Sequence, residues 1–314
     1  MAVVSKVYEL NTFVPFPNPR FPVRVLLIGL GRMGKLHLKC LSGLTSVDVV
    51  GVVDTDATRA DVADGLRFSA DPADFAGEFD AAVIAVPAES HARVALPLLA
   101  EGVNCLVEKP LALCSGEIGK MIAAARAGGA VLAVGQVERF NPQIENCAAR
   151  IDRQAGDIRI ERLSQGSGAP GEADVISDLM IHDLDWIVRC EGSTDCTIDL
   201  LETRGPIDRL EYVRCGLDFG PRRYDLRAGH GEDCRKRTVR ISAADGATED
   251  YDLLDFMCGK SLDPLTRQAQ AFVDACHGGE TELATASDAL AVYRLIERIR
   301  ALGNPMLEPA ERIA

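Results

Sequence analysis

VRVLLIGLGRMG, residues 23–34, is the stretch that decides the fold of the first half of this 314-residue chain. Its first six residues form an apolar run typical of a strand that is buried on both faces of a sheet. Three glycines follow in G-x-G-x-x-G spacing, which allows a tight turn, the close approach of a pyrophosphate and close packing of the next helix. The N–H groups at that helix start bind phosphate. The predicted phosphate-binding turn consists of Gly29, Gly31, Arg32, Met33 and Gly34.

A second buried strand is predicted over Val47–Val53 (VDVVGVV), and Asp54 follows it directly. An acidic side chain at this distance from the glycines accepts hydrogen bonds from the adenosine ribose of a dinucleotide. It also repels a 2′-phosphate, so we expect NAD rather than NADP as the cofactor. The alternative is a half-domain of the same fold that binds no cofactor.

The whole sequence predicts an α/β chain with two domains. Strands alternate with helices over residues 22–140, which predicts a Rossmann domain with a doubly wound parallel sheet. Short strands joined by polar turns follow, so residues 141–314 are expected to form an α+β domain with a mostly antiparallel open sheet. Residues 1–21 contain three prolines and are predicted to be an extension. The predicted strands are Val23–Ile28, Val47–Val53, Ala81–Val86, Asn104–Val107, Val131–Val134, Ile158–Leu163, Thr197–Thr203, Leu210–Asp218, Arg222–Leu226 and Arg237–Ala243.

Helices are predicted where apolar residues recur at helical spacing. Glycines stand where two of these helices are expected to end, and Gly102 and Gly128 are therefore predicted C-caps. The predicted helices are Lys35–Leu44, Ser90–Glu101, Ser115–Ala127, Val175–Arg189, Leu265–His277 and Ser287–Ala301.

Composition excludes several classes of function. The net charge of −13 argues against nucleic acid or an anionic membrane as a partner, because both require a basic surface. The ten cysteines are scattered without a C-x-x-C pair, so we expect neither a disulfide framework nor a bound metal. No apolar run is long enough to cross a bilayer, and the N-terminus lacks a signal pattern. A reducing cytoplasm is the expected location.

Candidate site residues follow the next predicted strand of the parallel sheet. The carboxyl ends of such strands face the cofactor, which makes Val86, Pro87 and His91 candidate cofactor-binding residues. Ser90 is predicted to be the N-cap of the following helix, since serine is strongly preferred there.

Glu108 and Lys109 follow the strand after that and are expected at the same edge. A lysine at this edge can hydrogen-bond a substrate hydroxyl and assist proton transfer. An ordinary surface lysine is the alternative.

Asp178 and His182 are four residues apart in a predicted helix and so share one face. A carboxylate one turn from an imidazole can hold its tautomer and stabilise its protonated form, which suits a base that takes a proton from a carbinol. A helical ion pair without a catalytic role is the alternative.

Together these segments resemble the glucose-fructose oxidoreductase / inositol dehydrogenase / MocA (Gfo/Idh/MocA) family. The resemblance rests on GLGRMG at 29–34, AVP at 85–87, EKP at 108–110 and the Asp-x-x-x-His helix at 178–182, and extends over about 23–302. It implies an NAD-dependent dehydrogenase that interconverts an alcohol and a ketone of a sugar or cyclitol. It further implies that Lys109 assists proton movement, that Asp178 supports the substrate or the base, and that His182 is the acid/base.

Two further strings resemble the branch of UDP-N-acetylglucosamine 3-dehydrogenases: GQVERFNP at 135–142 and IERLSQ…DVISDLMIHDLD at 160–185. The resemblance implies that Arg139, Phe140 and Asn141 line the cofactor or substrate cleft, with Arg139 and Asn141 binding substrate together with Lys109, Asp178 and His182. Asn141 before a proline is alternatively a turn and helix start. The loop QGSGAPGEA at 165–173 departs from the expected pattern, because it has no basic residue for a diphosphate.

The expected function is therefore oxidation of a ring hydroxyl of a sugar nucleotide by NAD, with the 3-position of UDP-N-acetylglucosamine as first choice. A dehydrogenase of a free sugar or inositol is one alternative, and a non-catalytic dinucleotide-sensing binding protein is another. Because oxidation of a secondary alcohol by NAD is uphill, a downstream aminotransferase is an expected partner. A homodimer or homotetramer formed through the C-terminal sheet is also expected.

Overall fold

The computed structural model describes residues 22–63, 65–151, 156–165, 174–206, 209–243, 245–255 and 263–303. The chain divides into two compact units. The first contains the chain up to Gly135 together with Leu265–Ala286, and the second contains Gln136–Pro264 and the chain from Ser287 onward. This division differs from the predicted one, because Leu265–Ala286 returns to the first unit and adds a strand to its sheet.

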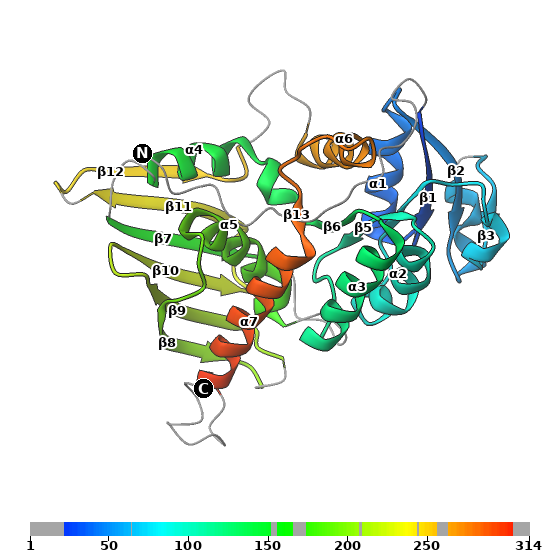
Figure 1. The fold of residues 1–314 in the computed structure, drawn as a ribbon. Coiled ribbons are helices and arrows are strands. Elements are labelled where there is room, and N and C mark those ends of the chain that lie inside the picture. Colours follow the sequence, from blue (N-terminus) through cyan, green and yellow to red (C-terminus); the bar gives the residue numbers. More distant parts are fainter. Residues whose placement is uncertain are drawn as a thin grey trace. The chain divides into compact units, whose positions relative to one another are not determined.

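The first unit is built on a seven-stranded sheet in the order β13-β6-β5-β4-β1-β2-β3, which is parallel except for β13 (Figure 1). Right-handed crossovers in the two directions from β1 place α1 on one face and α2 and α3 on the other. The strands are β1 (Val23–Ile28), β2 (Val47–Val53), β3 (Phe68–Ser69), β4 (Ala81–Ile84), β5 (Asn104–Glu108), β6 (Leu132–Gly135) and β13 (Ala284–Thr285). The helices are α1 (Arg32–Ser42), α2 (His91–Ala100), α3 (Ser115–Gly128) and α6 (Pro264–Cys276).

The parallel Rossmann-like sheet is thus confirmed, with corrections at two helix boundaries. The predicted C-cap at Gly102 is displaced by one residue, since Glu101 caps α2 and Gly102 follows it in the left-handed conformation with a φ of 86°. The predicted C-cap at Gly128 is wrong, since Gly129 takes the left-handed conformation instead. Gly128 lies inside α3, where a Cβ would stand 2.0 Å from the carbonyl oxygen of Leu99. That glycine therefore permits close packing of α3 on α2.

The second unit contains a six-stranded sheet in the order β12-β11-β7-β10-β9-β8. Among the described strands of this second sheet, only β7 and β10 pair in parallel, so the predicted mostly antiparallel sheet is confirmed. The strands are β7 (Gly156–Leu163), β8 (Thr197–Arg204), β9 (Tyr212–Asp218), β10 (Arg222–Gly229), β11 (Lys236–Ala243) and β12 (Thr248–Asp252). The helices are α4 (Pro142–Ile151), α5 (Ile181–Glu191) and α7 (Ala286–Gly303), and a π-helical segment, Ile176–Met180, precedes α5.

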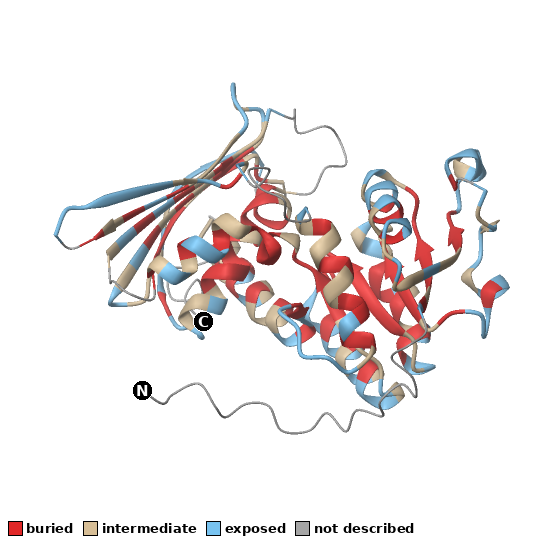
Figure 2. Ribbon diagram, turned by 90° about the horizontal axis from the view of Figure 1, so that it is seen from above, coloured by how far each residue is buried: buried red, intermediate tan, exposed pale blue. Residues whose placement is uncertain are grey.

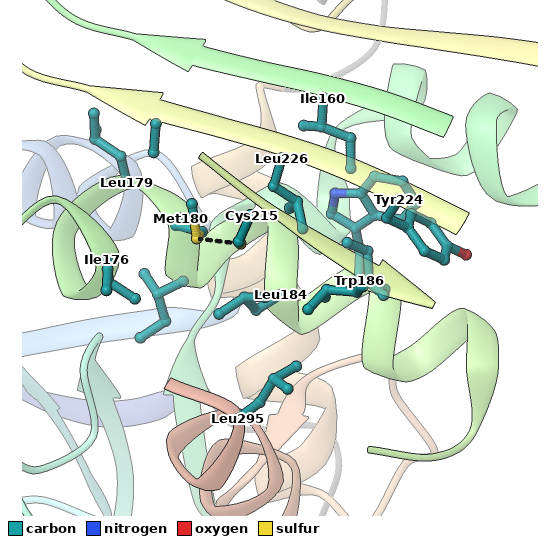
Figure 3. Packing of buried hydrophobic residues seen from close by; sticks show 14 of the residues in the cluster. Ile160, Ile176, Leu179, Met180, Leu184, Trp186, Cys215, Tyr224, Leu226 and Leu295 are labelled. Atoms are coloured by element: carbon teal, nitrogen blue, oxygen red, sulfur yellow. Dashed lines mark hydrogen bonds between the residues drawn. The ribbon is translucent and has the colours of Figure 1, made fainter. Parts of the chain in front are cut away.

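Helices cover one face of this sheet (Figure 2). The other face carries polar residues such as Arg159 of β7, Asp225 of β10 and Arg240 of β11. Residues alternate along β7, where Ile158 and Ile160 are buried while Arg159 is exposed. Figure 3 shows the covered face, where Trp186 of α5 meets Tyr224 of β10 with ring centroids 6.3 Å apart. This apolar layer fixes α5, which carries His182, on the sheet.

Strand β12 was not predicted because its sequence, TEDYD, offers a single half-buried apolar side chain, Tyr251. An edge strand has only one paired side and little burial, so it lacks the apolar pattern of a central strand. Helix α4 was anticipated only as a possible start at Asn141-Pro142, and the structure extends it to Ile151.

Candidate cofactor and catalytic site

The glycine turn has the geometry that its spacing predicts. Gly29 has a φ of 97°, and a Cβ there would stand 2.5 Å from the carbonyl oxygen of Ala85. A Cβ at Gly34 would stand 1.9 Å from the oxygen of Gly29, so the helix packs closely on the turn. At Gly31 the nearest atom to such a Cβ is Nη1 of Arg59 at 3.7 Å. The backbone at Gly31 is therefore open to an approaching phosphate.

The first turn of α1 is suited to an anion. Gly31 is the N-cap and makes no side-chain capping bond, and the first turn contains no acidic residue. Arg32 and Met33 are the first helical residues, so their N–H groups are among those without intrahelical acceptors. The helix start can thus receive a pyrophosphate.

Asp54 lies at the end of β2 and binds the glycine turn. Its Oδ2 accepts hydrogen bonds from the N–H of Leu30 at 2.6 Å and from Nη1 of Arg59 at 2.9 Å. Its Oδ1 accepts the N–H of Asp56 at 2.9 Å. Burial raises the pKa of Asp54, but these donors outweigh that effect and lower the pKa below its ordinary value. A carboxylate has about four acceptor positions, so one remains for a ribose hydroxyl.

The loop after β4 is tied to the loop after β5 by His91. Its ring is buried, with Nδ1 at 2.9 Å from the carbonyl oxygen of Pro110 and Nε2 at 3.0 Å from that of Val86. These two contacts hold the Val86-Pro87 backbone against the loop after β5. A cofactor-binding role for Val86, Pro87 and His91 stays a prediction. The predicted capping by Ser90 is wrong, because its hydroxyl makes no cap bond and accepts instead from Nη2 of Arg93 at 3.2 Å.

Glu108 is the buried last residue of β5 and pairs with a histidine that the sequence reasoning missed. Its Oε1 lies 2.7 Å from Nε2 of His37 on α1, and its Oε2 accepts the N–H of Lys109 at 3.2 Å. A Cβ at Gly135 would stand 3.0 Å from its carboxyl carbon, which explains the glycine there. The signal for His37 was its place on the apolar face of α1, with Gly34, Leu38 and Leu41.

Asp178 and His182 both lie in the second unit, whereas Lys109 lies in the first. Asp178 falls within the π-helical segment, and His182 is in the first turn of α5. A π segment widens the helix, so the i,i+4 geometry assumed from the sequence does not hold here without change. Such segments occur frequently at functional sites. The structure brings Nε2 of His230, another residue that sequence reasoning missed, to 3.6 Å from Oδ2 of Asp178.

Arg139 and Asn141 are buried and use their side chains inside the second unit. Arg139 forms two bonds to Asp185 of α5, from Nε at 2.7 Å and from Nη2 at 2.8 Å. Nδ2 of Asn141 donates to Glu138 at 2.8 Å and to the carbonyl oxygen of Leu253 at 2.9 Å. These contacts join the turn after β6 to α5 and to the end of β12. Substrate binding by either residue stays a prediction.

A buried ionic cluster lies beside these residues. Arg162, only 1% exposed, donates to Asp183 of α5 at 2.8 Å and to Glu138 at 2.9 Å, and Arg237 reaches Glu138 at 3.0 Å. Burial raises the pKa of Glu138, but attraction to the two arginines outweighs this and lowers it. Arg162 follows Ile158 and Ile160 on the inward side of β7, and that alternation was the signal for a buried arginine.

Within the described part of the chain, no helix is long and apolar enough to cross a membrane. Over the same residues, no group of three or more histidine, cysteine or acidic side chains is arranged to hold a metal ion.

Comparison with protein families matches the N-terminal segment of the first unit. Residues 23–136 match GFO_IDH_MocA, described as an oxidoreductase family with an NAD-binding Rossmann fold. The chain is a Gfo/Idh/MocA family oxidoreductase. Its cofactor is NAD, and the open backbone at Gly31 and the spare acceptor position of Asp54 fit that cofactor.

Several relatives of this Gfo/Idh/MocA chain have been described. It is 36% identical over 197 residues to a UDP-N-acetylglucosamine 3-dehydrogenase of Acidithiobacillus ferrooxidans, an alignment that covers 60% of this chain and 61% of that relative. It is 24% identical over 314 residues to an inositol 2-dehydrogenase of Rhizobium meliloti, covering 88% and 95% of the two chains.

Solved structures show the same fold. A UDP-N-acetylglucosamine 3-dehydrogenase from Acidithiobacillus ferrooxidans superimposes with a TM-score of 0.80 at 24% identity, covering 89% of this chain and 97% of that one. A protein of gentamicin A biosynthesis, solved in complex with NAD, gives a TM-score of 0.77 at 23% identity, covering 91% and 96%.

Proposed function

We propose that this family member is an NAD-dependent dehydrogenase that oxidises the 3-hydroxyl of UDP-N-acetylglucosamine to a ketone. The observation that carries the proposal is the intact cofactor turn: an open backbone at Gly31 whose neighbour Leu30 is bonded to Asp54. The 36% identical relative named for this reaction supports the choice of substrate.

The reaction divides between a hydride and a proton. When bound, NAD would supply the acceptor for the hydride that leaves the carbinol carbon. His182 takes the hydroxyl proton as the ketone forms, which balances the loss of two hydrogens from the alcohol. Lys109 donates a hydrogen bond to the reacting oxygen, and Asp178 supports the substrate or the imidazole.

The charge of Arg235 supports a nucleotide substrate, although the loop that begins at Gln165 has no basic residue of its own. Nε2 of Gln165 donates to the carbonyl oxygen of Asp233 at 3.0 Å, which brings the run from Cys234 to Arg237 beside the start of that loop. Lys236 pairs with Glu161, and Arg237 pairs with Glu138. Arg235 is exposed and forms no ion pair with another described residue. It can therefore bind a diphosphate.

Oxidation of a free sugar or inositol is the second candidate, supported by the full-length similarity to an inositol 2-dehydrogenase. A panel of UDP-sugars, GDP-sugars, free sugars and inositols, each incubated with NAD and a carbonyl trap, distinguishes the candidates. We expect nicotinamide reduction with UDP-N-acetylglucosamine and a product lacking two hydrogens. Reduction of NAD with inositol, and with no sugar nucleotide of the panel, would establish the second candidate. Binding of NAD without turnover of any compound would instead favour a non-catalytic dinucleotide-binding protein, and Lys109→Met is the matched inactive control.

We further propose a homodimer or homotetramer assembled through the polar face of the second unit's sheet. That face carries mixed charges paired across neighbouring strands, such as Arg240 with Asp250 and Arg214 with Asp225. A face with both signs of charge can complement a second copy of itself. Light scattering measures the assembly, and a monomeric mass at micromolar concentration would refute it.

The ketone product calls for a reaction that consumes it, because the equilibrium of alcohol oxidation by NAD lies towards the alcohol. An aminotransferase acting on the ketone is the partner we propose. The reducing cytoplasm expected from the cysteine pattern likewise stays a prediction, as does the absence of a nucleic-acid partner at a net charge of −13.

A further inference from the structure

His230 has a buried side chain that takes no part in the cofactor turn or in the proposed proton path. It directly follows β10, and its N–H donates to the carbonyl oxygen of Glu211 at 2.8 Å. Its side chain is 7% exposed, and Nε2 is buried without a hydrogen bond to any described residue. A buried polar atom in this state requires an explanation. The group that it faces is the carboxylate of Asp178, 3.6 Å away.

Asp178 is placed to contact both this imidazole and a ligand. Its side chain is 39% exposed, so the carboxylate also reaches solvent. The N–H of Ile181 bonds to the carbonyl oxygen of Ile176, five residues earlier, and this π-helical turn carries Asp178. The position of the carboxylate therefore depends on an irregular backbone, and a contact from another element would limit its rotation.

We propose that His230 is a positioning residue for Asp178. In its Nε2–H tautomer it donates to Oδ2 of Asp178 and holds the carboxylate in the orientation needed at the reacting hydroxyl. A separation of 3.6 Å is longer than a hydrogen bond, but catalytic hydrogen bonds are often long in the free enzyme and shorten when the substrate binds. This inference rests on the proposed function, in which Asp178 supports the substrate or His182.

Two substitutions at position 230 separate this role from simple packing. His230→Phe keeps a ring but removes the donor, whereas His230→Gln restores an N–H donor of similar reach. We expect His230→Phe to lower kcat about 10- to 100-fold with KM little changed, the loss typical of a slightly misplaced group. His230→Gln should recover most of that loss. His277→Gln, at the end of α6 in the first unit, controls for the loss of a histidine and should retain full activity. Wild-type kcat in His230→Phe, or equal losses in both variants, would overturn the proposal.

A second readout does not depend on the substrate. The chain has five histidines, so their imidazole NMR signals can be resolved, and His230→Gln assigns its signal by removing it. At constant pH, Asp178→Asn should shift the Nε2 resonance of His230 and leave that of His91 unchanged. An unchanged His230 resonance would refute the pairing even in an active enzyme. A shifted resonance in a protein that oxidises no tested compound would support the pairing while refuting the proposed function.

Discussion

The N–H of Leu30 donates a 2.6 Å hydrogen bond to the carboxylate of Asp54, which fixes the glycine turn to the end of β2. The same oxygen accepts Nη1 of Arg59 at 2.9 Å. A residue predicted from the sequence to accept the ribose thus also holds the turn that is predicted to receive the pyrophosphate. Its partner Arg59 keeps a cation beside the predicted ribose acceptor.

Asp54→Ala should weaken NAD binding about 10-fold or more, because a hydrogen bond to a charged acceptor is lost. Binding of NADP should improve relative to NAD, since the anionic repulsion disappears and Arg59 is released. Titration calorimetry with both cofactors measures this change. Adding Arg59→Ala to the variant should abolish the gain for NADP. Unchanged affinities in Asp54→Ala would place this residue outside the cofactor site.

Acid should remove a part of the stability that Asp54 provides. Its pKa in the folded protein lies below the ordinary value, so its contribution is present above about pH 3.9 and is lost as the pH falls through the folded pKa. The difference in free energy of unfolding between the wild type and Asp54→Asn should therefore shrink with falling pH. Urea unfolding at a series of pH values tests this, and a constant difference would contradict it.

Gly31 and Gly34 should respond differently to added side chains. Gly31→Val should abolish NAD binding and keep the fold, because its Cβ would meet nothing nearer than Nη1 of Arg59 at 3.7 Å and would occupy the space that the pyrophosphate needs. Gly34→Ala should lower the free energy of unfolding, since its Cβ would stand 1.9 Å from the carbonyl oxygen of Gly29. Melting temperatures and NAD titrations of both variants separate the two effects. Normal NAD affinity in Gly31→Val would remove the basis of the proposed function.

Lys109→Met and His182→Ala should each lower kcat by at least ~10²-fold while NAD affinity stays near that of the wild type. Because both residues are proposed to serve one proton path, the double variant should be much less impaired than the product of the single defects. His182→Ala should also lose one limb of the pH–rate profile, as expected for the loss of an imidazole. Turnover at the wild-type rate with an unchanged profile would leave His182 with a structural role only.

Arg235→Gln should raise KM for a UDP-sugar about 10-fold, the effect of losing one charge-assisted bond to phosphate. Lys236→Gln is the matched control. The Lys236 side chain, next to Arg235 in the chain, already pairs with Glu161, so its loss should leave KM unchanged. Steady-state kinetics with the sugar nucleotide measure both values. Equal KM values in the wild type and Arg235→Gln would direct the search for the diphosphate site elsewhere.

The sequence was sufficient for features that depend on neighbouring residues. The glycine turn, Asp54 and the alternation of strands and helices are local patterns, because backbone freedom and periodic burial act over a few residues. Local patterns misplaced the C-cap at Gly128 and the cap at Ser90. Close packing against Leu99 decides the first, and a contact from Arg93 decides the second.

Tertiary structure decided the partners of the polar residues. His37 meets Glu108 from 71 positions away in the chain, and His230 meets Asp178 from 52 positions away. Arg139, expected at a substrate cleft, is held by Asp185 inside the second unit. A charged side chain carries no local sign of its partner, since pairing depends on which strands and helices the topology brings together. The sequence by itself therefore determined the cofactor turn and the family, and only the folded chain determined which buried groups hold the site residues in place.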